Sequence, residues 1–373
     1  MRWLALVSDA FGGMGGIAQY NRDLLSAAAA SGQIHSIRVL PRHAMEPAQV
    51  PAGIYQMAPK RRAAYPLVAI AAALTERLDV VFCGHLHFAP LAAAIASARG
   101  ARLVVQAHGI EVWTRPRNIW RAAIERSDFV LAVSRYTRRA VLRFSAVMPE
   151  RVIVLSNTVG DVFTPGDTNG FRRRLGIEKS RILLTVGRMD SRERYKGQDR
   201  IIAALPGLLN SGLDVVYVIV GEGDDRARLE QLACRAGVQE RVSFLGAMKP
   251  EHLVEAYRAA DLFVMPSTGE GFGISFLEAM ACGTPALGLA AGGAVDALVD
   301  GELGTVVTED NLFAALARAL AKPKEGGEAL ASQVRARFGR AVFQEQVSAF
   351  VERLGEAASA PLTNAGACKM HRA

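Results

Sequence analysis

Two glutamates in one glycine-rich segment are the first residues whose types and spacing point to chemistry. Glu270 lies in a Gly-Glu-Gly-Phe-Gly loop that starts at Gly269, and Glu278 follows eight positions later, shortly before Ala-Cys-Gly-Thr-Pro. The apolar run Asp261–Pro266 predicts a buried strand before the loop, and a helix is predicted from about Ser275. A strand, a glycine loop and a helix start leave free backbone N–H groups at the carboxyl edge of a sheet. This arrangement favours a ligand that carries hydroxyl groups and phosphates.

A second glycine-rich loop, Gly12–Gly16, follows the first apolar run of the chain. The spacing of Gly13, Gly15 and Ala18 also fits the dinucleotide-binding fingerprint, which requires an acidic residue at the end of the next strand. That strand ends instead in Pro-Arg-His at residues 41–43. The sequence therefore argues against a nicotinamide-dependent oxidoreductase.

Other polar side chains follow two further predicted strands. The loop Gly187–Gly197 is basic, and its cations are Arg188, Arg192, Arg194 and Lys196. In the first half of the chain, His108 directly follows a strand. A basic loop alone is usually a solvated surface, and a single histidine is usually structural. Their pattern alone assigns them no role, except that we expect His108 at the carboxyl edge of the first sheet, which faces the second domain.

Short apolar runs alternate with helical patterns along the whole chain, which predicts an α/β fold with doubly wound parallel sheets. In the first half we predict strands at Trp3–Val7, Ser36–Leu40, Gly53–Met57, Asp79–Cys83, Arg102–Gln106, Phe129–Val133 and Val152–Leu155. In the second half we predict strands at Ile182–Val186, Val215–Val220, Val242–Leu245, Leu262–Met265, Pro285–Leu289 and Thr305–Val307. We expect domains at 1–160 and 171–340, a linker within 156–170 and a disordered tail at 359–373.

Composition limits the class of protein. The 373 residues are 50% hydrophobic, which is enough for two domains with cores of their own. There is no run of about 18 uncharged apolar residues, so no membrane-spanning helix is predicted. The four cysteines are far apart and are expected to be reduced thiols of a cytosolic protein: Cys83, Cys234, Cys282 and Cys368.

The positive charge is concentrated in the first half of the chain. Residues 1–165 carry 19 basic and 10 acidic residues, while the whole chain has 44 and 36, which leaves 25 and 26 for the rest. A nucleic-acid-binding protein is a distant alternative, because no basic run interleaved with aromatic residues supports it.

The segment from Gly269 to Pro285 resembles the signature of the retaining glycosyltransferases of family 4. The resemblance extends over most of the chain and implies the GT-B fold, which has two facing Rossmann-like domains. It also implies that a helix at about 341–358 packs back on the first, acceptor-binding domain, while the second domain binds a nucleotide sugar. The chain departs from the family pattern at Asn157-Thr158-Val159-Gly160, where the family usually has Asn-Gly-Val-Asp.

The resemblance also implies roles for individual residues. Glu270 would hold the transferred sugar together with backbone groups of Phe272, Gly273 and Ile274, and Glu278 would hold the ribose. Contacts to the diphosphate, the sugar and the nucleobase would come from further residues: Gly15, Gly16, Arg188 and Lys196 at the diphosphate, His108 beside the sugar, and the segment that includes Met248 near the base. Two fixed cations would stabilise the charge of the departing diphosphate. No Asp-x-Asp follows a predicted strand, and we predict no essential metal.

These residues together predict a metal-independent, retaining glycosyltransferase. It would move a hexose from a GDP- or UDP-linked donor to a glycan or lipid-linked saccharide in polysaccharide or glycoconjugate biosynthesis. A sugar phosphorylase or a sugar-nucleotide epimerase of GT-B fold is the alternative that the sequence leaves open. We expect a cytoplasmic protein, which could bind the inner face of an anionic membrane through its basic first domain.

The predicted helix at 134–147 is the most basic element of that domain. Ser134 is a predicted N-cap, and four arginines follow at helical spacing: Arg135, Arg138, Arg139 and Arg143. A solvated face and a membrane-binding stripe are the two interpretations of this pattern.

Overall fold

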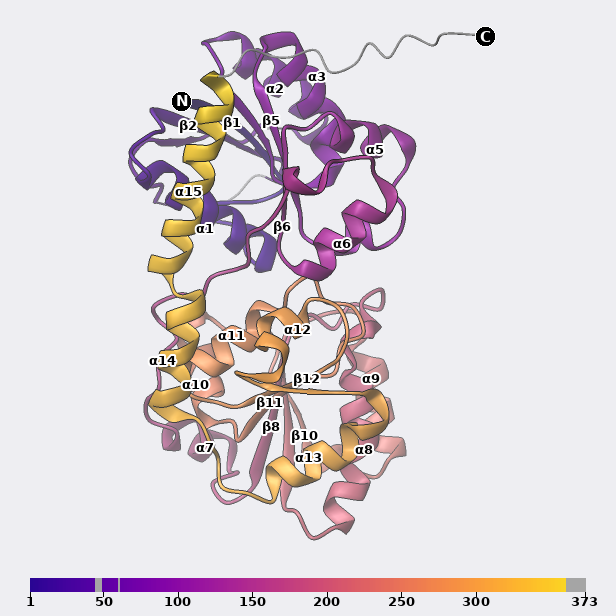
Figure 1. Ribbon diagram of the computed structural model, residues 1–373. Helices are drawn as coiled ribbons and strands as arrows, with labels where there is room; N and C mark the ends of the chain where they lie inside the picture. The colour runs from indigo at the N-terminus through magenta and orange to yellow at the C-terminus, as the bar shows by residue number, and fades with distance from the viewer. Residues whose placement is uncertain (44–48, 60, 360–373) are drawn as a thin grey trace.

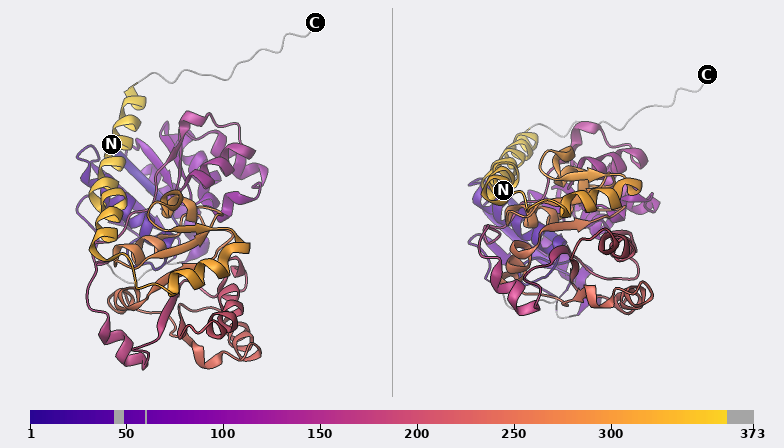
Figure 2. Two further views of the ribbon diagram at one scale, coloured as in Figure 1. Left: turned by 60° about the horizontal axis from the view of Figure 1, so that its bottom comes forward. Right: turned by 90° about the horizontal axis from the view of Figure 1, so that it is seen from below.

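Two α/β domains make up the protein, as the computed structural model shows (Figures 1 and 2). The structure describes residues 1–43, 49–59 and 61–359. Each domain has one parallel sheet with helices on both faces, which confirms the predicted doubly wound fold. Lys60 and the predicted tail beyond Ser359 lie outside the described residues.

The first sheet has the strand order β3-β2-β1-β4-β5-β6-β7. Its strands are β1 (Arg2–Val7), β2 (Ser36–Pro41), β3 (Ile54–Gln56), β4 (Val80–Cys83), β5 (Arg102–Ala107), β6 (Phe129–Ala132) and β7 (Val152–Val154). The helices of this domain are α1 (Gly16–Ala30), α2 (Tyr65–Leu74), α3 (Ala89–Arg99), α4 (Ile110–Trp113), α5 (Asn118–Glu125) and α6 (Arg135–Phe144).

The second sheet has the order β10-β9-β8-β11-β12-β13. Its strands are β8 (Arg181–Val186), β9 (Val215–Val220), β10 (Val242–Phe244), β11 (Leu262–Met265), β12 (Ala286–Leu289) and β13 (Thr305–Val307). The helices that follow the linker are α7 (Asn169–Leu175), α8 (Gln198–Asn210), α9 (Arg226–Arg235), α10 (Pro250–Ala259), α11 (Ile274–Ala281), α12 (Ala294–Ala297), α13 (Leu312–Leu320), α14 (Gly327–Phe338) and α15 (Arg340–Ser359).

Side chains of β1 alternate between two apolar layers, as expected for a strand that is buried on both faces. Trp3 and Ala5 pack in the layer that α1 and α15 cover, whereas Leu4 and Leu6 pack in the layer under α2 and α3. Apart from the Trp3 indole N–H, the core-facing side chains of β1 are apolar, which suits a central strand that is covered on both faces.

Helix α15 belongs to the end of the chain but lies along the first domain, whereas α14 lies along the second (Figure 1). The amide of Gln344 donates a hydrogen bond to the Ala27 carbonyl at 2.8 Å, and the Phe350 ring meets Phe129 edge-on. The linker contacts the same crossing, because the Thr158 hydroxyl and the Val159 N–H both donate to the Phe338 carbonyl.

Two helices are shorter than their sequence patterns predict. Helix α2 ends at Leu74 instead of continuing to Arg77, and the Arg38 guanidinium from β2 binds the Ala72 carbonyl there. Helix α6 ends at Phe144, because Ser145 has extended backbone angles. In the described parts of the chain, no helix combines the length and the apolarity that a bilayer crossing requires.

Candidate functional site

The point where the second sheet changes its direction of growth brings two predicted loops together. Strands β8 and β11 pair directly, while the chain between them builds the other side of the sheet. Loops that follow such a pair of strands open side by side at the carboxyl edge. The loop after β8 holds Arg188 and Lys196, and the loop after β11 holds Glu270.

A carboxylate that the sequence analysis did not single out holds both predicted cations. The Lys196 ammonium lies 2.9 Å from Glu193 Oε2, and the Arg188 guanidinium also binds Glu193. Lys196 and Glu193 are nearly buried, whereas Arg188 is exposed. Its place inside a basic loop was the only sequence signal for Glu193.

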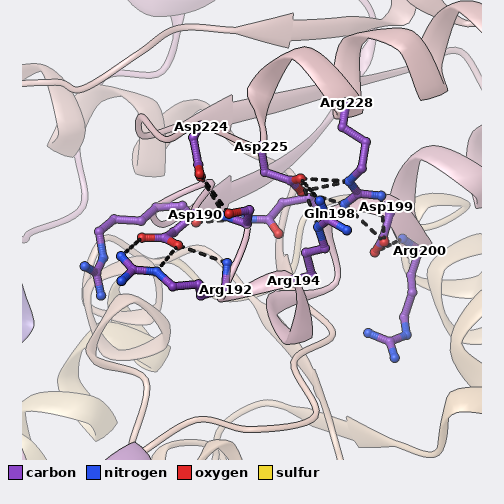
Figure 3. Close-up of polar contacts among 11 residues, drawn as sticks. Asp190, Arg192, Arg194, Gln198, Asp199, Arg200, Asp224, Asp225 and Arg228 are labelled. Atoms are coloured by element: carbon purple, nitrogen blue, oxygen red, sulfur yellow. Dashed lines mark hydrogen bonds and ion pairs between the residues drawn. The ribbon is translucent and has the colours of Figure 1, made fainter.

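The other arginines of this loop are engaged elsewhere (Figure 3). Arg192 pairs with Asp190 at 2.8 Å, and Arg194 pairs with Asp225 at 2.9 Å. Asp225 also binds Arg228, so it ties the loop to α9. These contacts anchor the loop, and they leave Arg188 as the arginine of the three that lines the cleft.

The Glu270 carboxylate is buried beside the cations. Its Oε1 atom has no hydrogen-bond partner among the residues that the structure describes. Burial raises the pKa of Glu270 to about 7, although the nearby Lys196 cation opposes that shift. The main chain of the loop is held in place, since the Gly293 N–H donates to the Glu270 carbonyl at 2.7 Å.

Glu278 lies on α11, the helix that directly follows the loop with Glu270. The Tyr257 hydroxyl donates a hydrogen bond to Glu278 Oε2 at 2.6 Å, and burial raises the pKa of this carboxyl to about 7 as well. Tyr257 is a second partner that the sequence analysis missed, because it comes from α10.

The glycine loops of the two domains approach each other closely. A Cβ atom on Gly271 would lie 2.0 Å from the His108 carbonyl oxygen, so only glycine fits there. Gly16, at the start of α1, faces Ile274 at the start of α11, since a Cβ on Gly16 would lie 4.0 Å from Ile274 Cγ2. The loops that hold Gly16 and His108 in the first domain therefore meet the loop and helix start that hold Gly271 and Ile274 in the second.

His108 is held as a neutral imidazole at the end of β5. Its Nε2 atom lies 2.9 Å from the Gly84 carbonyl, which assigns the proton to Nε2. Burial lowers the pKa of His108, although the Glu111 carboxylate opposes the shift. Glu111 also accepts a hydrogen bond from the His108 backbone N–H and so fixes the loop.

A cavity of about 400 Å³ is lined by residues of the first domain and, from the second domain, by Arg188. Its lining includes Gly15, Gly16, Arg42, His85, His87 and Arg188. The rings of His85 and His87 stack with centroids 4.6 Å apart, and burial lowers the pKa of His85 to about 4. The sequence analysis assigned no role to Arg42, His85 or His87, although each follows the end of a strand.

Two predicted residues lie further from these contacts. The Phe272 ring is buried against Phe338, so only the backbone of Phe272 faces the loop. Met248 lies half-buried beyond the end of β10 and packs on the apolar core. Gly273, by contrast, is the N-cap of α11 and has a positive φ of 92°, which favours glycine.

No group of three or more His, Cys, Asp or Glu side chains placed to hold a metal ion occurs in the described ranges. The metal independence of the reaction stays a prediction.

Comparison with known proteins assigns both halves of the chain. A model for "Glycosyltransferase Family 4" matches residues 14–161, and a model for "Glycosyl transferases group 1" matches residues 167–341. The GDP-mannose-dependent alpha-(1-6)-phosphatidylinositol monomannoside mannosyltransferase of Mycolicibacterium smegmatis is 34% identical over 267 residues, which cover 66% of this chain and 68% of that protein. A D-inositol 3-phosphate glycosyltransferase of Geodermatophilus obscurus is 36% identical, but the match covers 49% of this chain and 43% of that protein.

Solved structures share the fold at low identity. Sucrose-phosphate synthase from Thermosynechococcus elongatus has a TM-score of 0.78 at 22% identity and covers 96% of this chain and 100% of that one. Anabaena Alr3699/HepE, in complex with UDP and glucose, has a TM-score of 0.76 at 20% identity and covers 95% and 100%.

Replacing the buried Glu270 carboxylate by a neutral side chain should stabilise the folded protein, and the gain should be larger at high pH. We expect Glu270→Gln to raise the melting temperature at pH 8 and to change it less at pH 5. The pKa of Glu270 lies near 7 in the folded protein against an ordinary value of 4.5. Between these values the folded protein binds more protons than the unfolded chain, so the free energy of unfolding falls as the pH rises. Glutamine does not ionise and avoids that loss.

Differential scanning calorimetry at both pH values measures the effect, with Glu352→Gln as the exposed control. A difference in melting temperature between Glu270→Gln and the unsubstituted protein that stays constant from pH 5 to pH 8 would contradict the burial of this charge.

Proposed function

Because the chain belongs to the family 4-like glycosyltransferases of GT-B fold, we propose that it transfers a hexose, with retention of configuration, from a nucleoside diphosphate sugar to a hydroxyl group of a glycan or lipid-linked acceptor. The observation that carries this proposal is the cluster of Lys196, Arg188 and Glu193 beside the buried Glu270. Cations for a diphosphate and a carboxylate for sugar hydroxyls lie together at the switch point of the second sheet.

In the proposed reaction, the bond between the anomeric carbon and the diphosphate oxygen breaks on the same face on which the acceptor oxygen attacks. The acceptor proton passes to the departing phosphate oxygen, so no protein nucleophile is needed. Lys196 and Arg188 stabilise the negative charge that grows on that oxygen. Glu270 accepts hydrogen bonds from sugar hydroxyls, and neutral His108 lies across the cleft from it.

The donor is proposed to be a GDP- or UDP-linked hexose. The printed name of the Mycolicibacterium relative includes GDP-mannose, and the Anabaena structure holds UDP and glucose. GDP-mannose comes first because that relative is 34% identical to the chain, whereas the Anabaena protein is 20% identical.

A panel of nucleotide sugars, with released nucleotide measured, tests the proposed function. A glycosyltransferase releases GDP or UDP only as acceptor is consumed, and its rate survives chelation of divalent metals if the reaction is metal-independent. A phosphorylase would instead require inorganic phosphate, and an epimerase would change the donor sugar without releasing nucleotide. Either of these results, or no turnover of any donor, would reject the proposal.

Removal of one cation of the Lys196 and Arg188 pair should lower the turnover of the enzyme. Lys196→Ala should lower kcat by about 100-fold or more, because the lost charge acts most strongly on the departing phosphate. Lys322→Ala, at an exposed lysine far along the chain, is the control and should leave kcat unchanged. A folded Lys196→Ala protein that keeps near-normal kcat would rule out this role.

We also propose that the first domain binds anionic membranes, but the predicted arginine stripe on α6 is not the surface that does so. Arg135 binds Asp296 and Asp300 of the second domain, and Arg138 donates to the Val152 and Pro149 carbonyls. Only Arg139 and Arg143 of the four remain without such contacts among the described residues. The stripe is therefore divided between intramolecular contacts and solvent.

A different surface has the composition of a membrane-binding face. We define the α2/β3 patch as five exposed apolar side chains: Tyr55, Met57, Leu67, Ile70 and Leu74. It contains five of the eleven large exposed apolar side chains of the described chain, so exposed apolar surface is concentrated there. The ten residues of α2 include no charged side chain.

The strand register places both parts of this patch on one side of the molecule. Ile54 faces the layer under α1, so its neighbour Tyr55 faces the layer under α2. Arg38, the cross-strand partner of Tyr55, reaches the end of α2. Arg61 and Arg62 are exposed just before α2 and favour an anionic surface.

Sedimentation with phosphatidylglycerol-containing vesicles tests this binding. We expect the protein to pellet with them at low salt, and to stay in solution with phosphatidylcholine vesicles. Leu67→Ser with Ile70→Ser should abolish pelleting, whereas Arg139→Gln with Arg143→Gln should retain most of it. Equal pelleting of both double variants, or none by the unsubstituted protein, would contradict the assignment.

A further inference from the structure

Trp113 crosses the boundary between the two domains. It is the last residue of α4 in the first domain, and its indole lies against Gly269 and Tyr195 of the second. A Cβ atom on Gly269 would lie 3.0 Å from Trp113 Cζ3, and the Tyr195 ring meets the indole edge-on at 5.8 Å between centroids. On its own side, a Cβ on Gly109 would lie 3.1 Å from Trp113 Cζ2. Two glycines therefore leave a slot that the indole fills.

The residues that line this slot are chain neighbours of the proposed site residues. Gly269 precedes Glu270, and Tyr195 precedes Lys196. Because a rigid indole has few rotatable bonds, its insertion fixes the distance between these loops better than a flexible side chain would. The placement of Trp113 is thus linked to the placement of the charged groups.

Buried polar atoms without partners occur on both sides of this contact. In the described part of the molecule, Trp113 Nε1, Glu111 Oε2 and Glu270 Oε1 are buried and make no hydrogen bond. An unsatisfied buried polar group is unfavourable, and native structures contain few of them. Hexose hydroxyls both donate and accept, so they are chemically suited to groups of both kinds.

A charged contact also joins the two domains. Arg135, at the start of α6, lies 2.6 Å from Asp296 through Nε and 2.8 Å from both oxygens of Asp300 through Nη2. Asp300 and the preceding Val299 have φ values of 53° and 50°, which are rare for residues other than glycine. Such strained backbone tends to persist where surrounding contacts determine it.

We propose that Trp113 is a positioning residue for sugar transfer, and that the Arg135 contact with Asp296 and Asp300 is the latch that keeps its indole in the slot. This inference rests on the proposed glycosyl transfer. With the latch closed, His108 of the first domain and Glu270 of the second face the same sugar, and water is excluded from the bond that breaks. The latch and the slot are both contacts between the two domains, so they would break if the domains separate.

Trp113→Ala separates positioning from donor binding. We expect kcat for transfer, with the donor and acceptor identified by the panel, to fall about tenfold or more. The affinity for the bare nucleoside diphosphate, GDP or UDP, should change less than about twofold by calorimetry, because none of its proposed contacts, at Gly15, Gly16, Arg188, Lys196 and Glu278, is made by Trp113. Trp113→Phe keeps an aromatic ring in the slot and should recover most of the lost kcat.

The latch has a matched control on the same helix. Arg135→Gln should lower kcat in the same direction as Trp113→Ala, while Arg139→Gln, which removes an exposed arginine of α6, should leave it unchanged. Small-angle scattering gives a readout that does not need activity. Both Trp113→Ala and Arg135→Gln should enlarge the radius of gyration of the nucleotide-free protein.

The outcomes distinguish this inference from the proposed function. If no donor of the panel is turned over, the proposed function fails, and unchanged scattering of both variants would then reject the latch as well. If the unsubstituted enzyme is active, a Trp113→Ala protein with normal kcat overturns the inference. A parallel loss of kcat and nucleotide affinity also overturns it, since Trp113 would then belong to the donor pocket.

Discussion

The parallel pairing of β8 with β11 is the constraint on which the donor half of the site depends. It places the loop with Lys196 and the loop with Glu270 next to each other before any side chain is considered. Because Lys196, Glu193 and Glu270 are largely buried, their charges interact more strongly than charges at the surface do. Lys196 and Arg188 each form an ion pair with Glu193. A diphosphate carries more negative charge than one carboxylate, so it is well suited to compete with Glu193 for both cations.

Burial has opposite consequences for stability and for binding at this site. The Glu270 carboxylate loses its hydration in the folded protein. Attraction to Lys196 compensates only part of the free energy that this loss costs, so the pKa of Glu270 rises. The same loss of hydration leaves an acceptor free for sugar hydroxyls. Glu278 differs because Tyr257 already donates to it, so a ribose would add to an existing hydrogen bond. The second domain thus carries unfavourable charges that a substrate is able to compensate.

The sequence predicted the strands and their order of appearance well, because buried parallel strands are short apolar runs that glycine loops interrupt. The loops that hold Arg188, Lys196 and Glu270 follow from the predicted strands β8 and β11, whereas the roles of these residues come from the resemblance and stay predictions. The sequence did not predict partners that come from distant segments. Arg135 meets Asp300 from the other domain, and no local period encodes that contact. The arginine spacing on α6 indicated a single face, but neighbouring backbone and a second domain determine what each arginine binds.

The two connections between the domains explain why a latch is placed where it is. The linker and the junction of α14 with α15 cross together, and both meet at the Phe338 carbonyl. In Figure 1, α14 and α15 run along one side of the molecule, while α6 and α12 approach each other away from that side. Two domains that are connected at one side can open only at the opposite side. Weak contacts at that opposite side therefore have the largest effect on the opening of the cleft. An exposed ion pair contributes little by itself, about 0–1 kcal/mol. Such a contact, together with one indole, can close the cleft and still allow it to open in each cycle.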